Sequence, residues 1–164
     1  LADKLRKRGF TVEEISVGST PASLNEAYLE GITEVRPGTY IFNDLFVVGK
    51  WSCTLDDCAL TVLSTVVSRP CSNRIILDAG SKTLSSDRDK MGHGFIKNTG
   101  HYLSWLNEEH GIVNEFEGDL SIGTKVEIIP AHVCTTVNLA ERLYLTSGDE
   151  IVDTWEIDAR GKVQ

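Results

Sequence analysis

The order of strand and helix signals changes near residue 50, and this change restricts the possible folds more than any other feature. Residues 10–17 read as a short strand, residues 22–30 as a helix, and residues 32–36 return to strand character. A strand, a small-residue loop, a helix and a strand form a βαβ unit, which belongs to a parallel α/β sheet or barrel. Two strands cannot close a barrel, so we expect the rest of such a barrel to be absent from these 164 residues.

Beyond residue 50 the sequence reads mainly as short strands. A helix or turn is predicted over residues 102–108, and strands over residues 61–68, 74–77, 125–130, 135–139, 142–145 and 149–159. Short strands at this spacing are typical of an antiparallel β barrel or sandwich. We therefore expect an α/β portion over residues 1–48, followed by a mainly antiparallel β domain over residues 49–164.

Charge and composition exclude several classes of protein. Lys and Arg number 16 against 24 Asp and Glu, and the net charge of -8 has the wrong sign for a general nucleic-acid binder. No apolar run approaches the about 20 residues that a membrane span needs, so we expect no membrane partner. The four cysteines form no CxxC pair, which favours reduced thiols in a cytoplasmic protein.

A loop of small residues separates the first predicted strand from the helix that follows it. Gly18 allows the backbone to approach an anion closely, and Ser19 and Thr20 offer hydroxyl donors. The predicted helix points its free N–H groups and the positive end of its dipole at the same place, which is typical of a phosphate site. An ordinary βα loop whose Ser or Thr caps the helix explains the same residues.

A second candidate site is the pair formed by His132 and Cys134. Residues two apart in a strand point to the same face, so these side chains would converge if the segment is extended. Imidazole and thiolate are zinc ligands, and two of them leave coordination positions open, as catalytic sites do. A buried cysteine beside an incidental histidine explains the pair as well. Spacing does not choose among the possible further ligands, which are His93, His101, His110, Asp78 and Asp153.

Six segments, taken in order, resemble the C-terminal half of the D-threonine aldolase and eukaryotic-type D-serine dehydratase family. They are SVGSTP, EVRPGTYIFND, LDAGSKTLSSD, EEHG, PAHVCTTVNL and the terminal ARGK. Members of that family are pyridoxal-phosphate enzymes of the alanine racemase fold type, with an N-terminal barrel and a C-terminal β domain. The resemblance implies that the chain comprises the last βα units of a (β/α)8 barrel followed by that β domain.

The resemblance also implies roles for individual residues. The cofactor phosphate is expected at Gly18, Ser19 and Thr20. The rest of the cofactor is expected to lie near Arg36, Gly38 and Thr39. The metal-ligand pair of the family matches His132 and Cys134. Cysteine at the second metal position is similar to the zinc-dependent dehydratases, whereas the aldolases more often carry aspartate, which suits manganese. We therefore expect a D-serine dehydratase-like lyase that forms pyruvate and ammonia. D-Threonine aldolase-like cleavage of a D-β-hydroxy amino acid is the alternative.

One departure from the family concerns the Schiff-base lysine. The family carries this lysine in the first barrel strand, and no residue of the chain matches it. We therefore expect residues 1–164 alone to be inactive, and the full-length enzyme to be a homodimer. A non-catalytic β module that serves dimerisation is the competing expectation for these residues on their own.

Overall fold

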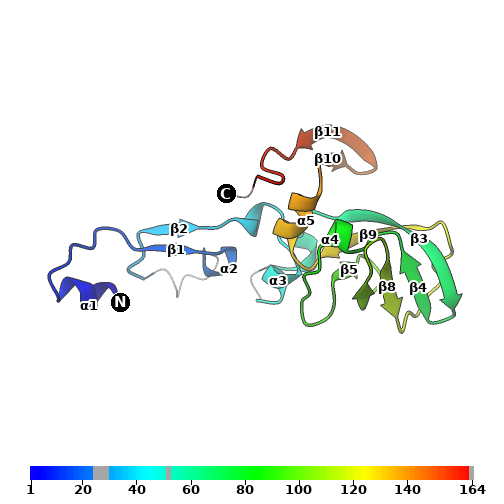
Figure 1. The fold of residues 1–164 in the computed structure, drawn as a ribbon, viewed down its shortest axis with the longest axis horizontal. Helices are drawn as coiled ribbons and strands as arrows, with labels where there is room; N and C mark the ends of the chain where they lie inside the picture. The colour runs from blue at the N-terminus through cyan, green and yellow to red at the C-terminus, as the bar shows by residue number, and fades with distance from the viewer. Residues whose placement is uncertain (24–29, 51–52, 163–164) are drawn as a thin grey trace.

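The computed structural model describes residues 1–23, 30–50 and 53–162. Its N-terminal part contains four short elements: α1 (Ala2–Arg6), β1 (Ser16–Gly18), α2 (Thr20–Ser23) and β2 (Glu34–Arg36). Strands β1 and β2 pair in parallel, with Gly18 opposite Arg36. In Figure 1 this pair forms an arm that extends away from the rest of the chain. A parallel pair with a helical turn between its strands is the arrangement that a βαβ unit requires.

The predicted boundaries in this arm need correction. The first strand covers only Ser16–Gly18, so the prediction of strand over residues 10–15 is wrong. Phe10 is exposed there and packs on no core cluster of the described residues. Helix α2 begins at Thr20, two residues before the predicted start, with Pro21 as its second residue, where a fixed φ suits the first turn. The rest of the predicted helix, over residues 24–29, lies outside the described residues.

A seven-stranded antiparallel sheet forms the main body, as the β-rich pattern predicts. The strand order is β6-β5-β9-β3-β4-β8-β7. Alternation of buried and exposed residues in the strands places one side of each against the core. The bounds are β3 (Val62–Cys71), β4 (Arg74–Leu77), β5 (Gly94–Ile96), β6 (His101–Tyr102), β7 (Trp105–Leu106), β8 (Gly111–Asn114) and β9 (Lys125–Pro130).

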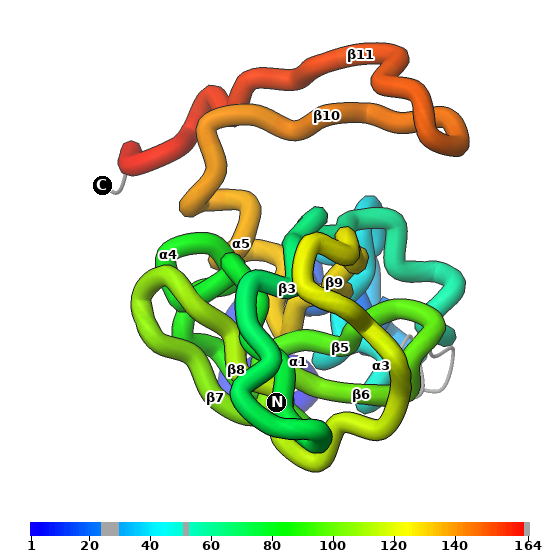
Figure 2. Tube along the Cα trace, turned by 90° about the vertical axis from the view of Figure 1, so that its right-hand side faces the viewer, coloured from blue at the N-terminus to red at the C-terminus, as the bar shows by residue number. Residues whose placement is uncertain are grey.

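The sheet curls until its two ends approach each other (Figure 2). Strands β6 and β7 stand at opposite ends of the strand order, yet only Leu103 and Ser104 separate them in the chain. The Leu103 N–H donates to the carbonyl of Gly94 at 2.9 Å, and the Ser104 N–H donates to the carbonyl of Ile112 at 2.8 Å. The prediction of a helix or turn over residues 102–108 is therefore wrong for residues 102–106, because backbone bonding to both ends of the sheet holds them extended.

The curled sheet encloses the larger hydrophobic core. Its fully buried members come from strands, from the segment that joins the two ends and from one short helix, residues 81–84: Val66, Ile75, Leu77, Leu84, Ile96, Leu103, Val113 and Ile128. Gly80 permits a close approach beside this core, since a Cβ there would collide with the carbonyl oxygens of Asn107 and Glu108. Each buried aliphatic side chain of this kind contributes about 1.5–3 kcal/mol through removal from water.

Short helices and a hairpin surround the sheet. Helix α3 packs a second cluster around Leu45, Cys58 and Ile129. These outer elements are η2 (Thr39–Ile41), α3 (Leu45–Val48), η3 (Leu55–Asp57), α4 (Ser81–Leu84), α5 (Val133–Leu139), β10 (Arg142–Ser147) and β11 (Glu150–Glu156). Strands β10 and β11 form an antiparallel hairpin beyond the sheet (Figure 2). Of the helices described, none combines the length and the apolar character needed to cross a membrane.

Candidate functional site

The candidate metal residues lie where β9 ends and α5 begins. His132 has extended backbone angles (φ −138°, ψ 112°) and precedes the first residue of α5, Val133. Cys134 is in the first turn of that helix, so the prediction of a strand over residues 135–139 is wrong. Residues two apart in a helix do not face each other, and the argument that a shared strand face unites His132 and Cys134 does not hold. Both nevertheless lie at the same end of α5.

Threonine hydroxyls of α5 lie close to the backbone carbonyl of His132. The Thr136 hydroxyl donates to the His132 carbonyl at 2.9 Å, and the Thr135 hydroxyl lies 3.2 Å from the same oxygen. The Thr136 bond satisfies its hydroxyl within the first turn, but back-bonding of this kind does not strengthen a helix. The β-branched residues of VCTTV predict a strand, so the helix depends on contacts from outside this segment.

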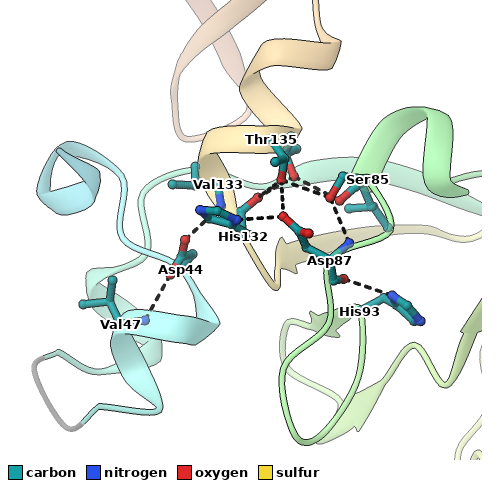
Figure 3. A network of polar contacts seen from close by, with 10 residues as sticks. Asp44, Val47, Ser85, Asp87, His93, His132, Val133 and Thr135 are labelled. Carbon is teal, nitrogen blue, oxygen red and sulfur yellow. Dashed lines mark hydrogen bonds and ion pairs between the residues drawn. The ribbon is translucent and has the colours of Figure 1, made fainter. Parts of the chain in front are cut away.

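Asp44 fixes the start of α5 from a distant part of the chain. Its side chain is 1% exposed, and its two carboxylate oxygens have separate partners. One oxygen accepts from the N–H of Val47 at 3.0 Å, as the N-cap of α3. The other accepts from the N–H of Val133 at 2.9 Å. Asp44 therefore joins α3 to the backbone between the two candidate metal residues (Figure 3).

The His132 ring pairs with a carboxylate that the sequence motifs do not single out. Nδ1 of His132 lies 2.7 Å from Oδ2 of Asp87, with side chains 30% and 35% exposed. The ring also packs on Phe46, with centroids 5.2 Å apart. Asp87 closes the segment LDAGSKTLSSD, and its place at the end of that segment is the only sequence signal that points to it.

A polar network holds Asp87 in turn (Figure 3). The Thr135 hydroxyl donates to Asp87 Oδ2 at 2.8 Å, and the Asp87 N–H donates to the Ser85 hydroxyl at 3.1 Å. Nδ1 of His93 lies 3.0 Å from the Asp87 carbonyl. The hydrogen bonds from Thr135 and His132 lower the pKa of the Asp87 carboxyl below its ordinary value. The carboxylate is thus charged and fixed beside the His132 ring.

Cys134 stands in a negative environment. Desolvation, followed by the charges of Asp44 and Asp87, raises the pKa of the Cys134 thiol above its ordinary value. Carboxylates that disfavour a thiolate also favour a bound cation, and a cation in turn favours the thiolate. The surroundings of Cys134 therefore suit metal binding more than they suit a free thiolate nucleophile.

The structure gives the other candidate ligands different partners. Nε2 of His101 contacts the backbone of Glu117, Asp78 accepts from Ser64 and Thr65, and Asp153 accepts from Trp155. His110 is exposed in the turn before β8. Across residues 1–23, 30–50 and 53–162, no group of three or more His, Cys, Asp or Glu side chains is arranged to hold a metal.

Most of the predicted cofactor residues meet at the ends of β1 and β2. Thr39 donates to the hydroxyl of buried Thr20 at 2.9 Å. The Arg36 guanidinium contacts the Ser16 hydroxyl and lies 3.5 Å from the Glu34 carboxylate. The carboxyl ends of parallel strands are where phosphate ligands bind in α/β folds.

The backbone at this place is open enough for an anion. Among the described residues, a Cβ on Gly18 would have only the Arg36 guanidinium within 4 Å, with Nη2 3.5 Å away. Ser19 has a left-handed φ of 84°, which turns the chain from β1 into α2. Gly38 precedes η2, and a Cβ there would meet no atom of the described residues within 4 Å. An open glycine face, hydroxyl groups and one cation are a donor set that fits a phosphate group.

The chain is similar in sequence to several known proteins. Residues 59–146 match the family model described as "Putative serine dehydratase domain". The chain is 34% identical to D-threo-3-hydroxyaspartate dehydratase of Delftia sp. over 94% of its own length and 46% of that protein. It is 32% identical to D-threonine aldolase of Arthrobacter sp., over 98% of its length and 43% of the relative, and 32% identical to D-serine dehydratase of Dictyostelium discoideum. The chain thus spans less than half the length of these relatives.

Solved structures of the hydroxyaspartate dehydratase have the same fold. One of them, a histidine-to-alanine mutant, matches 94% of the chain and 45% of its own length with a TM-score of 0.82 at 34% identity. Another, a cysteine-to-alanine mutant described as being in the metal-free form, matches with a TM-score of 0.79. The two replaced positions are two residues apart.

Proposed function

The chain belongs to the serine dehydratase domain family, and on this premise we propose that it forms the metal-bearing part of a pyridoxal-phosphate-dependent lyase for a D-β-hydroxy amino acid. D-Serine is the proposed substrate, with pyruvate and ammonia as the products. In this proposal residues 1–48 belong to the cofactor-binding portion, and residues 49–164 form the β domain that holds the metal.

One observation supports the metal site above all others. His132 and Cys134 have the same spacing as the histidine and the cysteine replaced in the two dehydratase mutants, one of which is metal-free. In this chain the pair stands at one end of α5, beside two carboxylates. We assign both side chains as ligands of a divalent metal.

The donor set fits zinc better than manganese. Imidazole nitrogen and thiolate sulfur are the ligands that zinc prefers, whereas manganese favours carboxylate and water. Zinc would supply Lewis-acid chemistry that helps a β-hydroxyl to leave, and pyridoxal phosphate would supply an electron sink for the α-carbon. Gly18, Ser19 and Thr20 are proposed to hold the cofactor phosphate, with Arg36, Gly38 and Thr39 beside it. His132 and Cys134 would hold the metal, and its remaining coordination would be available to substrate.

A second activity is supported by the aldolase relative. D-Threonine aldolase is 32% identical to the chain over 98% of the chain's length. The same ligands would then serve cleavage of the Cα–Cβ bond, with glycine and an aldehyde as products. Products separate the two activities in a polypeptide that joins these residues to a Schiff-base lysine: D-serine gives pyruvate and ammonia by elimination, and D-threonine gives glycine and acetaldehyde by cleavage.

Cobalt spectroscopy of the protein itself tests whether this site binds a β-hydroxy amino acid. Cobalt(II) replaces zinc in sites of this kind, and its visible absorption bands respond to any change in its ligands. We expect D-serine to shift these bands and D-alanine, which lacks only the β-hydroxyl, to leave them unchanged. Equal spectra with both amino acids would contradict the proposal and would favour a β module without a catalytic role.

A further inference from the structure

We propose that Asp87 is a positioning residue of the metal site. Its carboxylate accepts a hydrogen bond from Nδ1–H of His132, and this leaves Nε2 as the atom that binds the metal. The inference rests on the proposed function, since it concerns the same metal. It adds a residue that lies 45 positions away from His132 in the chain and on a different element.

The direction of the hydrogen bond follows from the chemistry of the two groups. A charged carboxylate has no hydrogen to give, so the nitrogen 2.7 Å from Asp87 Oδ2 must be the donor. A neutral imidazole carries one N–H, and placing it at Nδ1 leaves the lone pair at Nε2. Among the contacts of the described residues, Nε2 of His132 has no hydrogen-bond partner. That nitrogen is therefore ready to bind a metal.

The carboxylate is held independently of the ring that it orients. Thr135 donates to Asp87 Oδ2 at 2.8 Å, and Ser85 accepts the Asp87 N–H at 3.1 Å. The Ser85 and Thr135 hydroxyls are themselves 3.0 Å apart. With these contacts, the orientation of Asp87 does not depend on the metal being bound.

Two contacts then restrict the His132 ring from different directions. Asp87 binds its Nδ1 edge, and the ring of Phe46 packs on it at an angle of 44° between planes. The backbone of His132 is held at the start of α5, because the next N–H group, that of Val133, donates a hydrogen bond to Asp44. A ring fixed in both orientation and tautomer loses little freedom when a metal binds, which is the general advantage of a carboxylate behind a histidine ligand.

Nitrogen-15 NMR of the metal-free protein tests this role without any metal or any activity. The two ring nitrogens have separate chemical shifts that report which of them carries the hydrogen. In the native protein we expect His132 to show a protonated Nδ1 and an unprotonated Nε2. In Asp87→Ala we expect a mixture of the two tautomers, because the acceptor is gone. An unchanged tautomer in Asp87→Ala would overturn the proposal.

Zinc titration provides the second measurement. We expect Asp87→Ala to bind zinc about 10–100-fold more weakly than the native protein. Asp89→Ala is the matched control, because Asp89 lies in the same loop and its carboxylate accepts from the N–H groups of Met91 and Gly92 rather than from His132. Native zinc affinity in Asp87→Ala, or an equal loss in Asp89→Ala, would contradict a specific role for Asp87.

A conservative variant keeps the proposal testable if Asp87→Ala does not fold. Asp87→Asn has nearly the same shape, but its amide can donate to Nδ1 and so stabilise the tautomer with hydrogen on Nε2. We expect this variant to show the Nε2–H tautomer and weaker zinc binding. If the native protein binds no zinc, the proposed function fails, while the NMR spectra still decide whether Asp87 sets the tautomer.

Discussion

Replacing His132 or Cys134 by alanine is expected to abolish stoichiometric zinc binding. Four-ligand zinc sites bind with apparent free energies of about 10–16 kcal/mol, so one protein ligand contributes roughly 3 kcal/mol, or about a hundredfold in affinity. Each substitution leaves one of the two proposed ligands, His132 or Cys134, and the described residues contain no group of three ligating side chains that could hold the metal instead. Competition with a chromophoric chelator measures the loss directly.

Matched substitutions separate this effect from a general one. Cys71→Ala removes an exposed thiol at the end of β3, and His110→Ala removes an exposed imidazole in the turn before β8. Both are expected to bind one zinc with native affinity. Equal losses in these controls would show that zinc binds surface side chains at random, and retained binding in His132→Ala would remove the basis of the proposed metal site.

Asp44→Ala is expected to lower the free energy of unfolding by about 2–4 kcal/mol. The substitution leaves the Val133 N–H without its acceptor, which costs about 1–3 kcal/mol. It also removes the side-chain cap of α3, which costs about 0.5–2 kcal/mol, although the Val47 N–H keeps its bond to the Asp44 carbonyl at 3.1 Å. Part of this cost is offset because a buried carboxylate no longer has to be desolvated. Urea unfolding followed by circular dichroism gives the change.

Two further variants define the role of Asp44. An asparagine can still cap α3 through its one amide oxygen, so Asp44→Asn is expected to fall between the native protein and Asp44→Ala. Asp56→Ala changes an exposed aspartate in η3 and is expected to stay within about 0.5 kcal/mol of the native protein. A stability of Asp44→Ala equal to that of Asp56→Ala would contradict the buried double contact.

Zinc affinity should also fall in Asp44→Ala, since Val133 lies between the two proposed ligands.

The sequence predicts the strands better than it predicts the site. Short apolar runs rich in β-branched residues mark KVEIIP and RIIL, so β9 and β4 are predictable from local sequence. The segment after β9 is misread because VCTTV has strand propensity, while its helix depends on Asp44, 89 residues away from Val133. Local patterns hold no information about an acceptor so distant in the chain.

The two proposed metal ligands are predictable from the sequence, whereas the carboxylate beside them is not. His132 and Cys134 are recognisable because their side chains are ligand types at close spacing. Asp87 is one of many acidic residues, and only folding places its carboxylate 2.7 Å from the His132 ring. The Thr20–Thr39 contact likewise appears only once β1 and β2 are paired in parallel.

Zinc X-ray absorption spectroscopy of the metal-loaded protein tests the central claim most directly, because it reports the atoms bound to the metal. We expect one sulfur at about 2.3 Å and nitrogen or oxygen ligands at about 2.0–2.1 Å, with the sulfur absent in Cys134→Ala. A native spectrum that shows only nitrogen and oxygen, or a sulfur that persists in Cys134→Ala, would contradict a metal site at the start of α5.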